Sequence, residues 1–287
     1  MIKDVRIIIL VDNISNDRIF HKEHGLSLWV EADNHRIVFD TGQSDILCHN
    51  AIKCGVDFST ADSLILSHGH YDHTGGVADV LVSNPKIAVF CHPGIFIPRY
   101  SQHVDGRLHQ IGIGNVTAGA LHRRVDTIHW ISQPTTITNH IGITGPIPRV
   151  VEYENTGGDF FLDTDATRPD SIDDDSAMWI TTPKGLVVVT GCCHSGLVNT
   201  LMYIQTLTDN KPIYAVIGGF HLLNATQKRL TETCNYLKNS GVKKIIPCHC
   251  TGENAVEYME KECAGIVEKG HVGAVYNFLR YNGVKVC

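Results

Sequence analysis

The sequence has no long apolar run, no block of one charge and no export signal. No stretch approaches the ~20 consecutive apolar residues that a membrane helix needs, and the apolar run within residues 1–10 is too short and wrongly flanked for a signal peptide. The net charge is −6, and no Lys/Arg-rich segment offsets it. These absences argue against a membrane span and a nucleic-acid surface, so we expect a cytoplasmic protein with a small-molecule substrate. The sequence does not indicate an oligomeric state.

Two catalytic motifs and a disulfide framework are also missing. There is no Gly-x-Ser-x-Gly turn and no Gly-rich phosphate-binding loop, which argues against serine-hydrolase and P-loop chemistry. The chain has ten cysteines, but without an export signal they belong in a reducing compartment, where most are expected to be buried as small apolar side chains.

Length and composition predict one globular domain, residues 1–287, with a full core. Hydrophobic residues make up 43% of the chain and charged residues 19%, as in ordinary soluble proteins. Strand and helix patterns alternate in both halves, which predicts an α/β, four-layer αββα sandwich. The expected strands are 5–11, 26–32, 35–39, 64–66, 87–91, 127–131, 149–153, 177–181, 185–190, 213–217, 244–246 and 276–279. The expected helices are 44–54, 75–82, 196–207, 226–240 and 254–261.

Residues at about 95–170 interrupt this alternation. The segment is rich in Pro and Gly, but its interspersed Ile, Phe, Tyr and Trp argue against disorder. We interpret it as an insertion that walls the active site and carries substrate contacts. Its arginines are candidates for binding a phosphate group, namely Arg99, Arg107, Arg123, Arg124 and Arg149. Should the insertion supply metal ligands instead, the candidates are His103, His109 and His140.

The most informative segment is SHGHYDHTGG, residues 67–76, which contains His68, His70, Asp72 and His73. It directly follows a short apolar run, and a loop at a strand end can aim several side chains at one point. His68 and His70 can reach one ion, and Asp72 with His73 can reach a second ion beside it. Imidazole and carboxylate ligands together suit zinc or iron.

Three more histidines follow strand-like segments and lie in Gly-rich stretches. They are His194, His221 and His249. Because one loop cannot close two metal sites, the remaining ligands must come from distant parts of the chain. The shared position of these histidines at strand ends predicts that they complete the shell.

These segments resemble the metallo-β-lactamase superfamily. The resemblance is carried by residues 24–28, 39–43, 67–76, 190–196, 218–222 and 247–252. Within it, the chain is similar to proteins identified as metal-dependent hydrolases or dihydropterin ribofuranosyl-aminobenzene phosphate synthases. The resemblance implies the αββα metallo-β-lactamase fold with a dinuclear site at the strand ends between its sheets. It implies two divalent metal ions, with zinc preferred and iron or manganese as alternatives. It also implies that Asp40 orients a ligand histidine.

The chain departs from the family pattern where many relatives carry a bridging aspartate. At the comparable place it reads GCCH, residues 191–194. One interpretation is that Cys192 bridges the ions. Another, which we prefer because a thiolate there would oxidise readily, is that His194 completes the first site and His221 replaces the aspartate. Asp175 is a third option, although the acidic run 173–175 is more typical of a surface turn.

The expected chemistry is metal-assisted hydrolysis. Two ions ~3.5–4 Å apart can hold a hydroxide and polarise the substrate oxygen. We expect Asp72 to orient the hydroxide and Asp40 to act indirectly, through a ligand histidine. With few carboxylates the site stays positive, which favours an anionic ligand such as phosphate, and the resemblance implies a phosphorylated or pterin-like substrate. Two alternatives are a diiron oxidoreductase, whose relatives carry a flavin module absent here, and a non-catalytic sensor that uses its metals only to bind a ligand.

Overall fold

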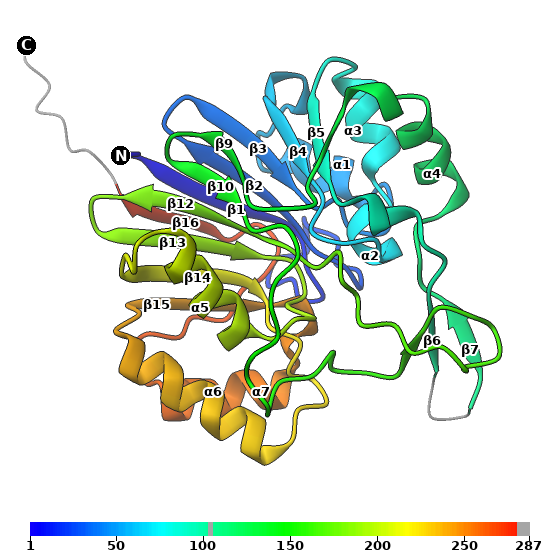
Figure 1. Cartoon of the computed structure of the whole chain (residues 1–287). Coiled ribbons are helices and arrows are strands. Elements are labelled where there is room, and N and C mark those ends of the chain that lie inside the picture. Colours follow the sequence, from blue (N-terminus) through cyan, green and yellow to red (C-terminus); the bar gives the residue numbers. More distant parts are fainter. Residues whose placement is uncertain (103–105, 280–287) are drawn as a thin grey trace, which may run out of the picture.

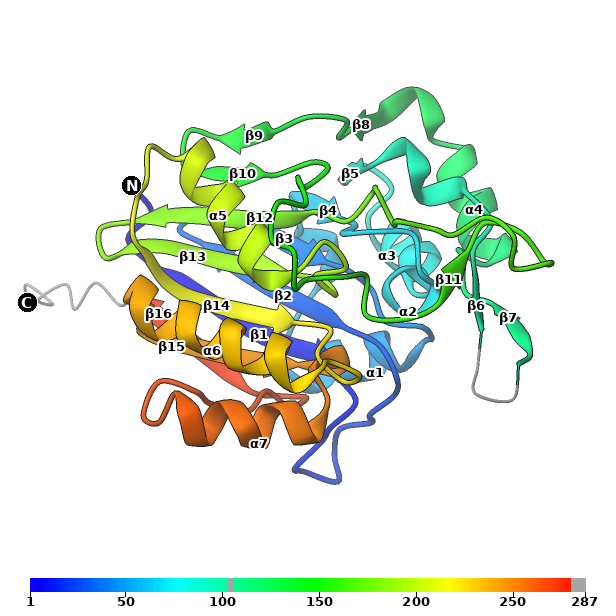
Figure 2. The same ribbon diagram turned by 60° about the horizontal axis from the view of Figure 1, so that its bottom comes forward.

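The computed structural model describes residues 1–102 and 106–279 (Figure 1). Two large β-sheets pack face to face, and helices lie on the outer side of each sheet, as the two views in Figures 1 and 2 show. The described residues thus form the four-layer αββα sandwich predicted from the alternation of strands and helices.

The first sheet has seven strands in the order β16-β1-β2-β3-β4-β5-β8. Strands β1, β2 and β3 are antiparallel neighbours, whereas β3, β4, β5 and β8 run parallel. Their bounds are β1 Val5–Val11, β2 Ser27–Ala32, β3 His35–Phe39, β4 Ser63–Ile65, β5 Ala88–Cys91, β8 Ile128–Trp130 and β16 Val275–Leu279. Its helices are α1 Ile46–Lys53, α2 Tyr71–Thr74, α3 Val77–Ser83 and α4 Asn115–His122.

The second sheet has six strands in the order β15-β14-β13-β12-β10-β9. Strands β13, β14 and β15 run parallel. The bounds are β9 Thr135–Thr138, β10 Ile141–Ile143, β12 Ala177–Thr182, β13 Gly185–Thr190, β14 Ile213–Gly219 and β15 Lys244–Cys248. Its helices are α5 Leu197–Leu207, α6 Gln227–Ser240 and α7 Glu253–Glu262.

Three apolar cores hold these layers together. Alternate residues of β1 enter different cores: Ile7 and Ile9 face the second sheet, while Ile8 packs against α1 and α3. In β13, Val187 lies between the sheets and Val188 packs under α5 and α6. A strand buried on both faces reads as a continuous apolar run, which explains why these segments were predicted as strands.

The insertion contains more regular structure than its composition suggested. It forms β8, β9, β10, α4 and a small sheet of β6 Tyr100–Gln102, β7 Leu108–Gln110 and β11 Phe160–Phe161, which projects from the main body in Figure 1. The strand predicted at 149–153 is wrong. The backbone amides of Val150 and Val151 instead donate to Oδ1 of Asn199 on α5, at 2.9 and 3.0 Å. The segment is therefore held by a side chain, not by a neighbouring strand.

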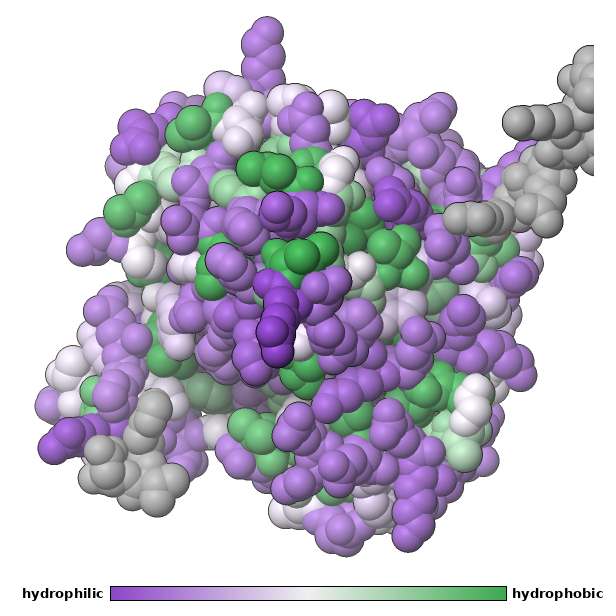
Figure 3. All heavy atoms as spheres, turned by 180° about the vertical axis from the view of Figure 1, so that it is seen from behind, coloured by the Kyte–Doolittle hydropathy of each residue, from purple (hydrophilic) through white to green (hydrophobic). Residues whose placement is uncertain are grey.

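The surface is mixed in character. Hydrophilic side chains cover most of the face in Figure 3, with hydrophobic residues in small groups between them. Exposed single apolar side chains of this kind are normal in folded proteins. Among residues 1–102 and 106–279, no helix has the length and apolar character required to cross a bilayer.

Candidate metal centre

Parallel strand ends bring the candidate residues together. Asp40 follows β3, and His68 follows β4 by three residues. In the other sheet, His194, His221 and His249 follow β13, β14 and β15. Because the carboxyl ends of parallel strands lie on the same edge of a sheet, all five side chains come to the edge where the two sheets meet.

His68, His70 and His194 form the first group. Their ring centroids are 4.5 Å (His68–His70), 4.9 Å (His68–His194) and 4.8 Å (His70–His194) apart. All three are buried, and the Nε2 atom of each has no hydrogen-bond partner among the described residues. The ligand atoms of His68 and His194 form a metal-sized group with that of Cys192, whereas His70 is in none of these groups among the described residues, and only its ring lies beside the other two. Buried imidazole nitrogens without partners are the arrangement that a metal ion satisfies.

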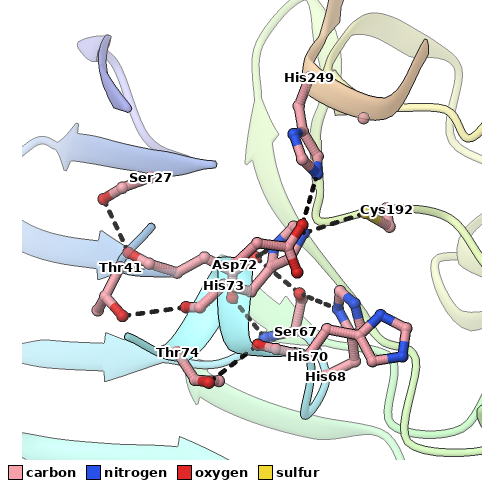
Figure 4. A network of polar contacts seen from close by, with 12 residues as sticks. Ser27, Thr41, Ser67, His68, His70, Asp72, His73, Thr74, Cys192 and His249 are labelled. Atoms are coloured by element: carbon pink, nitrogen blue, oxygen red, sulfur yellow. Dashed lines mark hydrogen bonds and ion pairs between the residues drawn. The ribbon is translucent and has the colours of Figure 1, made fainter. Parts of the chain in front are cut away.

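Asp72, His73 and His249 form the second group (Figure 4). Oδ2 of Asp72 lies 3.1 Å from Nε2 of His249 and 3.8 Å from Nε2 of His73. One carboxylate oxygen and two imidazole nitrogens therefore face a common point. This set of donors also fits a divalent ion such as zinc.

A hydrogen-bonded chain behind these groups fixes two of the rings. Oδ2 of Asp40 accepts from Nδ1 of His73 at 2.7 Å and from the hydroxyl of Ser67 at 2.7 Å. Because Ser67 donates its proton to Asp40, its oxygen is free to accept from Nδ1 of His68, 2.9 Å away. Both histidines are thereby held with Nε2 turned toward the centre. Asp40 acts through these residues and does not reach the converging atoms itself.

Two other acceptors fix His194 and His249 in the same way. Nδ1 of His194 donates to the carbonyl of Thr156 at 3.0 Å, and Nδ1 of His249 donates to Oδ1 of Asn13 at 2.8 Å. Four histidines from three separate segments, namely the motif 67–76 and the ends of β13 and β15, thus carry a proton on Nδ1. In His68, His194 and His249 the other nitrogen, Nε2, has no partner among the described residues, which is the ligand form of imidazole.

Cys192 lies between the two groups. Its sulfur falls within 4.8 Å of the ligand atoms of His68 and His194, and equally within 4.8 Å of those of His73 and His249. The distance from Sγ to Nε2 of His73 is 3.0 Å. Cys192, which the sequence favoured less than His221 as the bridging residue, thus has its sulfur near the ligand atoms of both groups.

His221 lies at the side of the centre. Its ring centroid is 4.3 Å from that of His194, and its ligand atom groups with the sulfurs of Cys192 and Cys250. Nδ1 of His221 is buried without a partner among the described residues. Cys250 was not predicted as a site residue; its position directly after His249 was the available signal.

Burial and neighbouring charges set the ionisation of these groups. Burial lowers the pKa values of His68, His70 and His194 well below the ordinary range, so these rings are neutral and can bind metal. Burial opposes charge on His73 as well, but the carboxylates of Asp72 and Asp40 raise its pKa to about 9. A metal ion at Nε2 of His73 must therefore displace a proton.

Several ligand loops adopt a left-handed backbone. Positive φ angles occur at Asp40 (56°), Cys193 (56°), His221 (45°) and His249 (48°). Such conformations cost about 1–3 kcal/mol for a residue with a side chain, and they collect at functional sites. The surrounding core holds these loops in shape against that cost.

A turn is present at 173–174 and Asp173 is exposed, but Asp174 and Asp175 are buried, so the predicted surface turn is wrong for these two residues. Oδ2 of Asp175 accepts from the backbone amide of Ser195 at 2.7 Å, and burial raises the Asp175 pKa to about 6. It fixes the loop that carries His194 and is in none of the metal-sized groups among the described residues.

Arg99, a candidate for binding phosphate, is buried and forms ion pairs with two carboxylates instead. Its guanidinium lies 3.0 Å from Oδ2 of Asp170 and 2.7 Å from Oδ1 of Asp174. Asp174 also accepts from the amide of Gly69 at 2.9 Å, so this buried triad anchors the loop that carries His68 and His70. Arg124 donates to the carbonyl of Ile87 at 2.8 Å.

Residues 149–161, which we call the strap, cross the first histidine group. Arg149 donates to the backbone carbonyl of His194 at 2.6 Å. The backbone carbonyl of Thr156 accepts from the imidazole ring of the same histidine. Gly157 has a φ of +88°, and a Cβ there would approach Cδ2 of His221 to 1.8 Å, so only glycine fits. Phe160 packs edge-on against His194 with ring centroids 5.2 Å apart.

A cavity of ≈ 300 Å³ opens onto the centre. From the insertion, it is lined by Ser101, Ile111 and Phe160. The insertion's other predicted ligand candidates lie elsewhere: His140 contacts the N-terminal amine of Met1 at 2.7 Å. His109 lies in β7 and is paired with Ser101 of β6, and His103 lies outside the described residues.

Comparison with known proteins decides the family. The family model described as "Metallo-beta-lactamase superfamily" matches residues 22–249. The chain belongs to the metallo-β-lactamase superfamily. The resemblance predicted from the sequence motifs is therefore confirmed, and the fold is that of a superfamily member.

Two archaeal superfamily relatives match almost the whole chain. It is 32% identical to 7,8-dihydropterin-6-methyl-4-(beta-D-ribofuranosyl)-aminobenzene-5'-phosphate synthase of Methanocaldococcus jannaschii, over 90% of this chain and 91% of the synthase. It is 33% identical to an uncharacterised protein of the same archaeon, over 93% of this chain and 98% of the relative.

Solved structures agree on the superfamily fold. Tm1679, described as a metal-dependent hydrolase of the beta-lactamase superfamily, shares 30% identity and a TM-score of 0.79, over 95% of this chain and 98% of that one. Zn(2+)-bound PqqB from Methylobacterium extorquens has a TM-score of 0.55 at 11% identity, over 94% of this chain and 99% of that one. The second likeness shows the fold alone.

Replacing Arg99 with Leu should strongly destabilise the protein. The change leaves the buried carboxylates of Asp170 and Asp174 without their partner, which costs about 3–5 kcal/mol. Urea unfolding followed by circular dichroism measures the loss. Arg18→Leu, on an exposed loop, is the control and should unfold like the parent protein. Equal midpoints for the two variants would contradict the anchoring role.

Replacing Asp40 with Asn should weaken metal binding while leaving the fold intact. The amide cannot accept from both Nδ1 of His73 and Ser67 as strongly as the carboxylate does, so the rings lose orientation, with an expected ~10–100-fold loss of affinity. Competition with a chromophoric chelator measures the affinity. Asp62→Asn is the control, since Asp62 accepts from the amide of Arg36 at 2.8 Å away from the site. Unchanged affinity in Asp40→Asn is the contrary result.

Proposed function

We propose that the chain is a metal-dependent hydrolase with a dinuclear site that acts on a small phosphorylated molecule. The observation that carries the proposal is a set of five buried imidazole nitrogens without hydrogen-bond partners among the described residues. They are Nε2 of His68, His70, His194 and His249, and Nδ1 of His221. A buried polar atom without a partner costs about 1–3 kcal/mol, which two bound ions would offset.

The first ion would be held by His68, His70 and His194. The second would be held by Asp72, His73 and His249. When bound, a pair of divalent ions activates a water molecule and polarises the substrate oxygen.

Asp72 has two tasks in this proposal. Burial disfavours its charge, but His73, His24 and His249 hold the pKa of Asp72 well below its usual range. It is therefore a carboxylate, with Oδ2 directed at His249 and Oδ1 left to orient water. Asp40 orients the ring of His73 through its Nδ1 and is a positioning residue.

We infer that Cys192 occupies the position between the ions. Its sulfur is near the ligand atoms of both groups, whereas His221 approaches only one side. A sulfur at this place, with Cys250 beside it, makes the site softer than an all-nitrogen and oxygen shell. Soft ligands favour zinc or iron over magnesium or calcium.

Cobalt substitution tests the sulfur ligand. The cobalt-loaded parent should show a near-ultraviolet sulfur-to-cobalt charge-transfer band, which Cys192→Ser should lose or strongly weaken. Cys193→Ser is the matched control, because the neighbouring Cys193 is buried in the core under α5, and it should keep the band. A parent without the band would return the shared position to His221, and a Cys192→Ser variant that retains it in full would assign the sulfur ligand to Cys250.

Charge favours a phosphate over a neutral substrate. Asp72 is the one carboxylate in the proposed shell, so with Cys192 as a thiolate the two divalent ions still leave a net positive centre. A phosphate ester complements this field better than a lactam does. The synthase to which the chain is similar is named for a product with a 5'-phosphate, which agrees with a phosphorylated ligand.

The expected activity is slow, metal-dependent hydrolysis of phosphoesters such as bis(4-nitrophenyl) phosphate. It should disappear with a chelator, return with zinc or manganese, and fall in acid because protons compete with metal for the ligand imidazoles. A parallel assay with a lactam and a thioester provides the comparison. Faster turnover of either one than of every phosphoester would overturn the substrate class but leave the metal site intact.

A second candidate is a synthase-type displacement, favoured by the similarity to the archaeal synthase. The same centre would then activate a phosphorylated molecule toward an acceptor other than water. Product analysis with and without an added aminobenzene separates the two candidates, since hydrolysis yields the same product in both assays.

A further inference from the structure

His24 stands apart from the other histidines of the centre. It lies in the loop between β1 and β2, and its side chain is 53% exposed, whereas those of His73 and His249 are buried. Its Nε2 is 3.1 Å from Oδ2 of Asp72, and its ring centroid is 4.8 Å from that of His249. Geometry alone would allow His24 to be an extra metal ligand, because His24, Asp72 and His249 form a metal-sized group.

The amide of Asn13 argues for a different role. Oδ1 of Asn13 accepts from the amide of Gly25 at 3.2 Å and from Nδ1 of His249 at 2.8 Å. The backbone N–H of Gly25 can only donate, so it fixes which end of the amide is oxygen, and Nδ1 of His249 is then the donor to the same oxygen. The nitrogen, Nδ2, then faces Nδ1 of His24 at 3.4 Å. Nδ2 can only donate, so Nδ1 of His24 is the acceptor and its proton lies on Nε2.

One amide thus sets opposite tautomers on two neighbouring rings. His249 has its proton on Nδ1 and presents a bare Nε2 to the metal position. His24 has its proton on Nε2 and presents a donor. A nitrogen that carries a proton cannot bind metal, but it can donate to an oxygen anion.

The donor of His24 lies at the boundary between two cavities, one of which opens onto the metal centre. His24 lines the ≈ 300 Å³ cavity at the metal centre and also a neighbouring cavity of ≈ 390 Å³. His221, His249 and Cys250 are the other residues that the two cavities share. The neighbouring cavity has apolar walls from Ile14, Leu223 and Val256 and a cation at Lys22. It can accept the part of a ligand that does not react.

We propose that His24 is a substrate-binding residue that donates a hydrogen bond from Nε2 to a phosphate oxygen at the second metal position. This inference rests on the proposed function. In the structure the donor is directed at Asp72; with a ligand in the cavity, a phosphate oxygen beside Asp72 takes its place as acceptor. The remainder of the ligand extends past His24 into the neighbouring cavity.

Binding of inorganic phosphate to the zinc-loaded protein tests the role of His24. Calorimetric titration compares the parent with His24→Ala and His24→Gln, and elemental analysis reports the metal content of each. The Ala variant should keep its metal and bind phosphate roughly 10–100-fold more weakly, the range for a hydrogen bond to a charged group. The Gln variant, which retains a donor, should recover part of the affinity. His21→Ala, in the same loop, should match the parent, because the His21 ring only stacks on His49.

The contrary outcomes separate the two proposals. Loss of metal in His24→Ala would make His24 a ligand and overturn its role as a donor. Full metal content with unchanged phosphate affinity would remove His24 from recognition and leave the proposed hydrolase standing. A parent that binds metal but no phosphate would overturn the phosphorylated substrate class together with this role.

The tautomer of His24 can be measured without a ligand. Nitrogen-detected correlation spectra of the zinc-loaded protein should place the His24 proton on Nε2 and the His249 proton on Nδ1. A His24 proton on Nδ1 would overturn the proposal whatever the phosphate affinity.

Discussion

The centre depends on where each buried imidazole places its one proton. A neutral ring has one N–H and one lone pair, and inside a protein the N–H needs an acceptor. Each of four rings donates a hydrogen bond from Nδ1 to its own acceptor: His73 to Asp40, His68 to Ser67, His194 to Thr156 and His249 to Asn13. The acceptors lie at strand ends of the first sheet and in the strap, whereas His194 and His249 follow strands of the second sheet. The layers must therefore pack correctly before the four lone pairs can converge.

This requirement gives the insertion a structural purpose besides lining the cavity. The carbonyl of Thr156 anchors His194, and Gly157 leaves room for His221. Arg99 pairs with Asp174, which accepts from the amide of Gly69 in the motif loop. The loops that carry the histidines are strained, with left-handed residues at several turns. Buried ion pairs and hydrogen bonds around them hold these strained conformations in place. The strain lowers the stability of the protein, and packing of the apolar cores offsets it.

Sequence patterns predicted the regular layers well because their signals are local. Continuous apolar runs such as 5–11 and 185–190 match β1 and β13, and Thr226 with Gly241 bounds α6 as expected. The insertion was predicted less well. Its short strands pair with distant partners, and residues 150–151 are held by Asn199 rather than by a strand. Such contacts leave no period in the sequence.

The sequence by itself determined the family, the layer order and the motif, because ligand type and spacing within one loop are local properties. It also placed His194, His221 and His249 at strand ends. Only the tertiary structure decided that Cys192 lies between the two groups, that Asp174 and Asp175 are buried, and that Asn13 and His24 belong to the centre. The physical reason is that the partners and the burial of these side chains are set where strand ends from different sheets meet. Residues that meet there can be hundreds of positions apart, so no pattern in the chain connects them.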